Sequence, residues 1–170
     1  MSVSRFPAHL RLLGPMRAES ASRRDTAPSF AAVDLDLATG VATRTALLER
    51  LDAMGQLAPR APLSFLVVKV SGLASRDGEA ALKAVAARIR QLTRATDTVG
   101  RLTGTAFGIA LQGTGATAAG AVAARLTHHL NRLADLSPSI CITVSAASGT
   151  GVNADTLHVA AMDTFAPCCG

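Results

Sequence analysis

Two charged side chains, Arg94 and Asp97, stand three positions apart just before an apolar stretch of the sequence. An arginine fork can grip a phosphate or the O6/N7 edge of guanine, and a carboxylate can accept from N–H donors. Arg101 follows closely and can add a second cation. The spacing alone is weak, because a chain this rich in arginine yields about one such match by chance. Arg132 and Asp135 form a second match. A solvated ion pair at a helix end, with Asp97 capping the turn, is therefore the competing interpretation.

The remaining reactive side chains form no recognisable catalytic or metal-binding set. His128 and His129 are adjacent, so on a helix they point to different faces and cannot chelate a metal as an i, i+4 pair would. Cys141, Cys168 and Cys169 are too few and too clustered for a disulfide framework, which indicates a reduced, cytoplasmic protein. We therefore expect no metal site, and we interpret the two terminal thiols as uninvolved rather than as a reactive pair.

The composition predicts one folded domain preceded by a tail. Of the 170 residues, 49% are apolar and 3% are aromatic, which is enough for a core but leaves few rings to stack on single-stranded nucleic acid. Residues 1–33 are an Arg-rich tail or linker, either a solvated arm or an anion-binding one, whereas residues 34–170 are nearly neutral. We expect no nucleic-acid partner and no membrane insertion. Residues 102–124 are uncharged, but their glycines and threonines favour a packed hairpin and helix.

Hydrophobic periodicity and turn residues predict eight elements. Thr43 is a suitable N-cap for a first helix that Pro59 ends, and a last helix follows Asn153 and stops at Pro167. The expected elements between them are a strand at 63–70, a helix at 79–94, strands at 98–102 and 106–112, a helix at 117–134, and a strand that begins after Pro138 and ends at Gly149 and Gly151. This βαββαβ order predicts an α+β, ferredoxin-like fold with an antiparallel-containing sheet backed by helices.

Four short sequence motifs, which follow one another in the family's order, resemble those of the GGDEF domain, the diguanylate cyclase family. Asp36–Arg44 is similar to the family's opening D-x-L-T-G-L-x-N-R, and Arg94–Phe107 is similar to R-x-x-D-x-x-x-R-x-G-G-D-E-F. Ile142–Ser145 resembles its I-T-V-S strand, and Ala154–Leu157 resembles the A-D-x-L that opens its last helix. The resemblance covers about residues 34–166 and implies a sheet of the nucleotidyl cyclase or palm-like kind.

The residues that catalysis needs in this family are missing. The family joins two GTP molecules into cyclic di-GMP, with Mg²⁺ held by carboxylates on the first strand and in the signature hairpin. The strand position is Lys69 here, and its charge would repel the metal. The segment after that strand is also about seven residues shorter than the family pattern. The residues at the hairpin motif are Thr103, Gly104, Thr105, Ala106 and Phe107, so the acidic residues of the family motif are absent. The resemblance therefore implies a degenerate domain that is not an enzyme and binds no Mg²⁺.

In the family, the R-x-x-D motif before the hairpin forms an inhibitory site for cyclic di-GMP. The resemblance therefore implies a cyclic di-GMP receptor in bacterial signalling, with Arg94, Asp97 and Arg101 holding the ligand and no other cofactor. The alternative is a nucleotide-independent module that meets a signalling protein, or its own copy as a homodimer, through a helix face or the Arg-rich tail. Both interpretations expect a protein partner.

Overall fold

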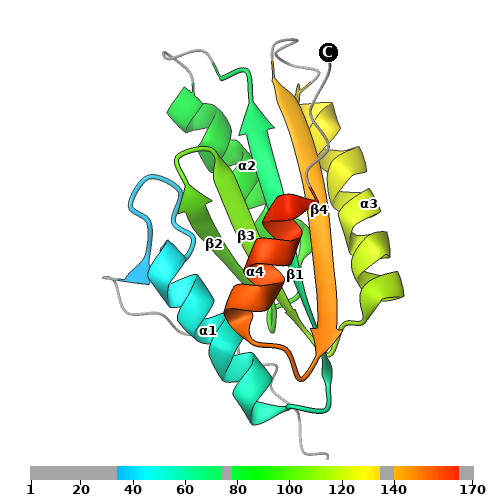
Figure 1. Cartoon of the computed structure of the whole chain (residues 1–170). Coiled ribbons are helices and arrows are strands. Elements are labelled where there is room, and N and C mark those ends of the chain that lie inside the picture. The colour runs from blue at the N-terminus through cyan, green and yellow to red at the C-terminus, as the bar shows by residue number, and fades with distance from the viewer. Residues whose placement is uncertain (1–33, 74–77, 135–139, 165–170) are drawn as a thin grey trace, which may run out of the picture.

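The computed structural model describes residues 34–73, 78–134 and 140–164 (Figure 1). Its elements run in the order α1 (Arg44–Leu57), β1 (Pro62–Ser71), α2 (Gly78–Leu92), β2 (Thr98–Thr103), β3 (Ala106–Gln112), α3 (Ala116–Ala134), β4 (Cys141–Thr150) and α4 (Ala154–Asp163). This order confirms the predicted βαββαβ core with one helix before it and one after it. The predicted tail at 1–33, Pro138, Pro167 and the two terminal cysteines lie outside the described residues.

The four strands form one antiparallel sheet in the order β2-β3-β1-β4, which confirms the α+β, ferredoxin-like fold. β1 is central, and its Phe65 lies opposite Ala110 of β3 and Ala147 of β4. Residues 63–68 of β1 are all buried, because helices cover this strand on both faces. A continuous apolar run therefore suits β1, where a strand with one wet face would alternate apolar and polar residues.

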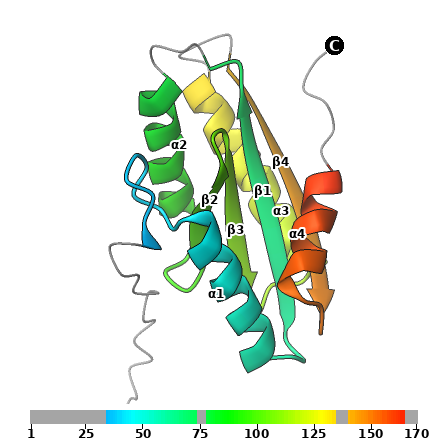
Figure 2. The same ribbon diagram turned by 60° about the vertical axis from the view of Figure 1, so that its left-hand side comes forward.

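One face of the sheet is covered by α2 and α3, which lie side by side (Figure 2). Leu82, Val85 and Ile89 of α2 recur at helical spacing, so all three point into the same core. In α3, Leu126 and Leu130 are fully buried, and each contributes about 2 kcal/mol by leaving water. This burial places the apolar stripe of α3 in the core.

The opposite face of the sheet is covered by α1 and α4 (Figure 1). Thr43 begins α1 by accepting a hydrogen bond from the N–H of Ala46, and Asn153 begins α4 by accepting one from the N–H of Thr156 (2.8 Å). Thr43 is the predicted cap, and Asn153 directly precedes the last helix as predicted. Each satisfies a backbone donor that the first helical turn leaves unpaired. The core of this layer contains Leu47, Leu51, Met54, Phe65, Val67, Leu157 and Ala161.

The helix predicted at 79–94 is shorter at its C-terminal end than the sequence pattern indicated. It ends at Leu92, and the Thr93 hydroxyl donates to the carbonyl of Ile89 (3.1 Å) just beyond the last turn. Such side-chain bonds compete with helix continuation. Arg94 therefore belongs to the turn before β2 and not to the helix, which sets the position of the candidate site.

The last strand continues past Gly149, the first of the two glycines expected to end it, and stops before the second, Gly151. β4 passes through Gly149 and ends at Thr150. A Cβ at position 149 would lie 2.6 Å from Cγ2 of Val152, so glycine serves here to admit a neighbouring side chain. The uncharged residues 102–124 form the end of β2, the strand β3 and the start of α3, as predicted. Within the described ranges, each helix is too short or too polar to cross a membrane.

Candidate functional site

Arg94 and Asp97, the two residues of the Arg-x-x-Asp motif, form the turn between α2 and β2. The backbone N–H of Arg94 donates to Oδ2 of Asp97 (2.8 Å), and the N–H of Asp97 donates to the carbonyl of Arg94 (3.1 Å). Together these bonds close the turn that leads into β2. Asp97 therefore caps the turn with one oxygen, as the competing interpretation expected. Its other oxygen, Oδ1, accepts no hydrogen bond from the described residues.

Asp97 is partly buried beside two cations. Burial raises the pKa of Asp97, and the hydrogen bond from Arg94 and the charges of Arg94 and Arg125 oppose this rise without cancelling it. Arg125 comes from α3, where its Nη2 donates to the carbonyl of Leu92 at the end of α2 (2.8 Å). Sequence analysis missed Arg125, because nothing in its local pattern shows that α3 packs against the end of α2. The three side chains form one charged group that we call the turn cluster (Arg94, Asp97 and Arg125).

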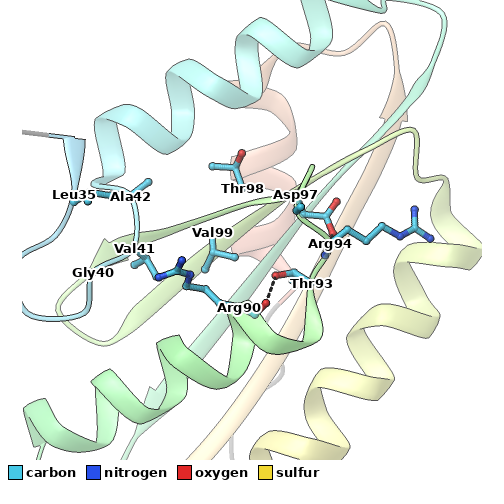
Figure 3. A pocket seen from close by; sticks show the side chains of 11 residues that line it. Leu35, Gly40, Val41, Ala42, Arg90, Thr93, Arg94, Asp97, Thr98 and Val99 are labelled. Carbon is cyan, nitrogen blue, oxygen red and sulfur yellow. Dashed lines mark hydrogen bonds between the residues drawn. The ribbon is translucent and has the colours of Figure 1, made fainter. Parts of the chain in front are cut away.

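A cavity of about 540 Å³ opens next to this turn, between the loop at 35–42 and the first residues of β2. Figure 3 shows that the Arg90 side chain extends from α2 toward Val41, on the cavity side. The Arg94 side chain extends the opposite way, toward α3 (Figure 3). Arg90, Arg94 and Asp97 all line this cavity, so the turn places two cations and one carboxylate around it. Sequence analysis did not single out Arg90 either.

Arg101 makes contacts away from the other two predicted ligand residues. Its Nη1 donates to Oδ1 of Asp36 (3.0 Å), and its Nη2 donates to the carbonyl of Gly104 (2.8 Å). Burial raises the pKa of Asp36, but hydrogen bonds from Thr39 and Arg101 outweigh this effect and hold that pKa below its ordinary value. The structure thus brings Arg94 and Asp97 together, and it places Arg101 in an ion pair outside the residues that line the cavity.

The β2–β3 turn and the start of β3 contain residues 103–107, the five residues of the hairpin motif. Its tip, Thr103, Gly104 and Thr105, is exposed, and it presents hydroxyl groups and backbone rather than carboxylates. Ala106 is buried against α1 and α4, whereas Phe107 is buried on the other face of the sheet. Ala106 and Phe107, the last two positions of the hairpin motif, are therefore core residues.

A family model described as the GGDEF domain of diguanylate cyclases matches residues 33–161, which is most of the chain. The chain belongs to the GGDEF domain family. This match confirms the resemblance that the four short motifs indicated. It begins and ends close to the expected boundaries, at about residues 34 and 166. A search of curated proteins found no match to this GGDEF domain.

Solved GGDEF structures share the fold of this domain. The FimX GGDEF domain from Pseudomonas aeruginosa has 19% sequence identity and a TM-score of 0.67, over 76% of this chain and 90% of that one. Diguanylate cyclase SiaD from Pseudomonas aeruginosa, solved with its activator SiaC, has 23% identity and a TM-score of 0.66, over 76% of this chain and 55% of that one. The GGDEF domain of DgcB from Caulobacter crescentus, solved with cyclic di-GMP, has 14% identity and a TM-score of 0.63, over 80% and 87%. At these identities the likeness concerns the fold alone.

Proposed function

We propose that this GGDEF domain does not make cyclic di-GMP and instead binds it through the turn cluster. The observation that carries the proposal is the grouping of Arg94, Asp97 and Arg125 at one end of the α2–α3 layer, with Asp97 keeping one oxygen available. The proposal makes the domain a receptor in cyclic di-GMP signalling. Binding would change how the domain meets a partner protein.

The position of Lys69 supports the loss of catalysis. Lys69 is exposed on β1, where it lies opposite Ala106 of β3 and Thr143 of β4. The Mg²⁺ that cyclases of the family use prefers carboxylate oxygens and retained water, so an ammonium group at this place is unsuitable. Across the described ranges, His, Cys, Asp and Glu side chains form no group of three or more that could hold a metal ion. The residues present do not fit Mg²⁺.

The chemistry of the turn cluster suits a guanine and a phosphate. An arginine donates two parallel hydrogen bonds to a phosphate or to O6 and N7 of guanine, and a carboxylate accepts from the guanine N1 and N2 hydrogens. Arg94 supplies a fork, and Oδ1 of Asp97 supplies the acceptor. Arg125 supplies a second cation, whose Nη2 already donates to the carbonyl of Leu92. DgcB was solved in complex with cyclic di-GMP, which is consistent with this ligand class for the fold.

A nucleotide-independent interaction module is the second candidate function. It is favoured by the hydrogen bond from the Arg94 N–H to Asp97, because this bond gives the Arg-x-x-Asp motif a structural role that needs no ligand. SiaD, a structural relative, was solved with a protein activator. In this interpretation, the domain binds its partner equally well with and without cyclic di-GMP.

Isothermal titration with cyclic di-GMP separates the two candidates. The informative variants are Arg94→Ala, Arg125→Ala and Asp97→Asn, since an asparagine can still accept from the Arg94 N–H and so preserve the turn. Arg60→Ala is the control, because Arg60 is an exposed arginine that does not line the cavity beside the turn. We expect each of the three variants to lose at least about tenfold in affinity, and the control to bind like the wild type. Equal heats in all five proteins would remove the turn cluster as the site.

A further inference from the structure

The outer face of the α2–α3 layer contains a second, cationic groove. It has a volume of about 330 Å³ and runs between the two helices. Together, α2 and α3 carry five lysines and arginines but one acid, Glu79, which lies in the first turn of α2. The groove is lined by four polar residues, Arg88, Gln91, His129 and Arg132, and by three apolar ones, Ala84, Ala87 and Leu133. We call this feature the α2–α3 groove.

Arg88 is held in place inside the α2–α3 groove by neutral groups. Its Nη1 donates to Oε1 of Gln91 (3.0 Å), and its Nη2 lies 3.1 Å from Nδ1 of His129. Because a guanidinium can only donate, Nδ1 is the acceptor and the proton of the neutral imidazole sits on Nε2. Among the described residues no carboxylate pairs with Arg88. Its orientation is therefore fixed while its charge stays available, which lowers the entropy cost of binding a carboxylate.

We propose that the α2–α3 groove binds an acidic helix of a partner protein. Carboxylates of that helix would pair with Arg88 and Arg132, and small apolar side chains between them would pack on Ala84 and Ala87. Charge complementarity carries the assignment, because the groove presents one sign of charge across two helices. The surface is separate from the turn cluster, and its partner would bind whether or not cyclic di-GMP does.

Neither the tail of this chain nor a second copy fits the groove. Residues 1–33 contain five arginines and two acids, so the tail has a net positive charge and is repelled by the cations of the groove. A symmetric dimer through this face would place Arg88 and Arg132 against their own copies, which like charges disfavour.

Nucleic acids and membranes fit less well than an acidic helix. Phe65 and Phe107, the aromatic rings of the described chain apart from histidine, are fully buried, so no platform exists on which bases could stack. The large apolar side chains that are exposed among the described residues lie on the N-terminal loop, α1 and α4, so the α2–α3 face offers no large exposed apolar side chain to insert into a bilayer.

The test uses the full chain and a labelled helical peptide of about 20 residues, long enough to form a helix by itself. One peptide carries glutamates at i, i+4 spacing beside an alanine stripe, and its control carries glutamines instead. Fluorescence anisotropy at roughly 150 mM salt suppresses purely long-range attraction. The variants are Arg88→Gln and His129→Ala. Their matched controls are the exposed Arg60→Gln and the neighbouring His128→Ala. A double variant, Arg23→Gln with Arg24→Gln, monitors the tail.

We expect the glutamate peptide to bind and the glutamine peptide to bind at least about tenfold more weakly. Arg88→Gln and His129→Ala should each weaken binding by about fivefold or more, because one removes the cation and the other removes its support. The Arg60, His128 and tail variants should remain within about twofold of the wild type. The proposal fails if the glutamate peptide does not bind, or if only the tail variant reduces binding. It also fails if vesicles of phosphatidylglycerol or a DNA duplex bind in an Arg88-dependent way while the peptide does not.

Discussion

Asp36 and Arg101 form an ion pair of 3.0 Å that joins the N-terminal loop to β2 across 65 positions of sequence. Both side chains are largely shielded, at 25% and 18% exposure. Arg101 also holds the carbonyl of Gly104, so one guanidinium connects the loop before α1 with the β2–β3 turn. Arg101, which the sequence suggested as a ligand contact, therefore takes part in a structural ion pair, and this pair has measurable consequences.

Replacing Asp36 with alanine should lower the free energy of unfolding by about 1 kcal/mol at pH 7, the usual value of a shielded but not fully buried pair. Because the pKa of Asp36 is lowered in the folded state, its stabilising effect is fully present above the unfolded pKa. It is lost as the pH falls through the folded pKa. Urea unfolding from pH 7 to pH 3 measures this effect. The difference between wild type and variant should shrink toward pH 3, whereas the exposed Glu49→Gln control should show no such convergence. A constant difference would contradict the role assigned to the pair.

Gly100 and Gly108 face each other in β2 and β3, and α1 packs directly onto both through Leu47. A Cβ would lie 2.7 Å from Cβ of Leu47 at position 100 and 2.6 Å from Cδ2 of Leu47 at position 108. Either Gly→Ala substitution should therefore cost about 1–3 kcal/mol of stability through overpacking.

Gly120 supplies the control for these glycine substitutions. It lies within α3, and a Cβ there would meet nothing within 4 Å. Gly120→Ala should raise stability by about 0.5–1 kcal/mol, because glycine loses more backbone entropy on folding. Thermal unfolding compares all variants. A neutral Gly100→Ala would show that α1 does not sit tightly on the sheet.

The sequence predicted the architecture well because the fold depends on features that are local in the chain. Apolar periodicity, the caps Thr43 and Asn153 and the glycine between two strands all act within a few residues. The contacts of Arg101 and Arg125 were not predicted, since both depend on where distant elements meet. The end of α2 was missed because the Thr93 side chain competes with the helix, an effect that periodicity does not report.

The affinity for cyclic di-GMP should depend on pH through Asp97. A carboxylate that accepts guanine hydrogens must be ionised, and burial raises the pKa of Asp97 above the ordinary aspartate value. Binding should therefore weaken as the pH falls through this raised pKa, at a higher pH than an exposed aspartate would give. Titrations between pH 7.5 and the acid limit of the fold measure it, with Asp97→Asn as the control that should be weak and independent of pH. A flat profile in the wild type would exclude Asp97 from the contact.

Restoring one carboxylate should not restore catalysis. Lys69→Asp removes the repelling charge, but the hairpin still presents Thr103 at a glycine position and Thr105 at an acidic position of the family motif. We expect no cyclic di-GMP from either protein after incubation with GTP and Mg²⁺, followed by chromatography of the nucleotides. Product from the wild type would overturn the interpretation of these positions. Product from the variant alone would show that Lys69 was the sole obstacle.

The most direct test of a receptor without cyclase activity is a set of parallel titrations of the full chain with cyclic di-GMP, with GTP plus Mg²⁺ and with GDP. The account predicts saturable heat with cyclic di-GMP that Asp97→Asn removes, and no heat with GTP and Mg²⁺. Saturable, Mg²⁺-dependent binding of GTP, or the absence of any heat with cyclic di-GMP, would contradict it.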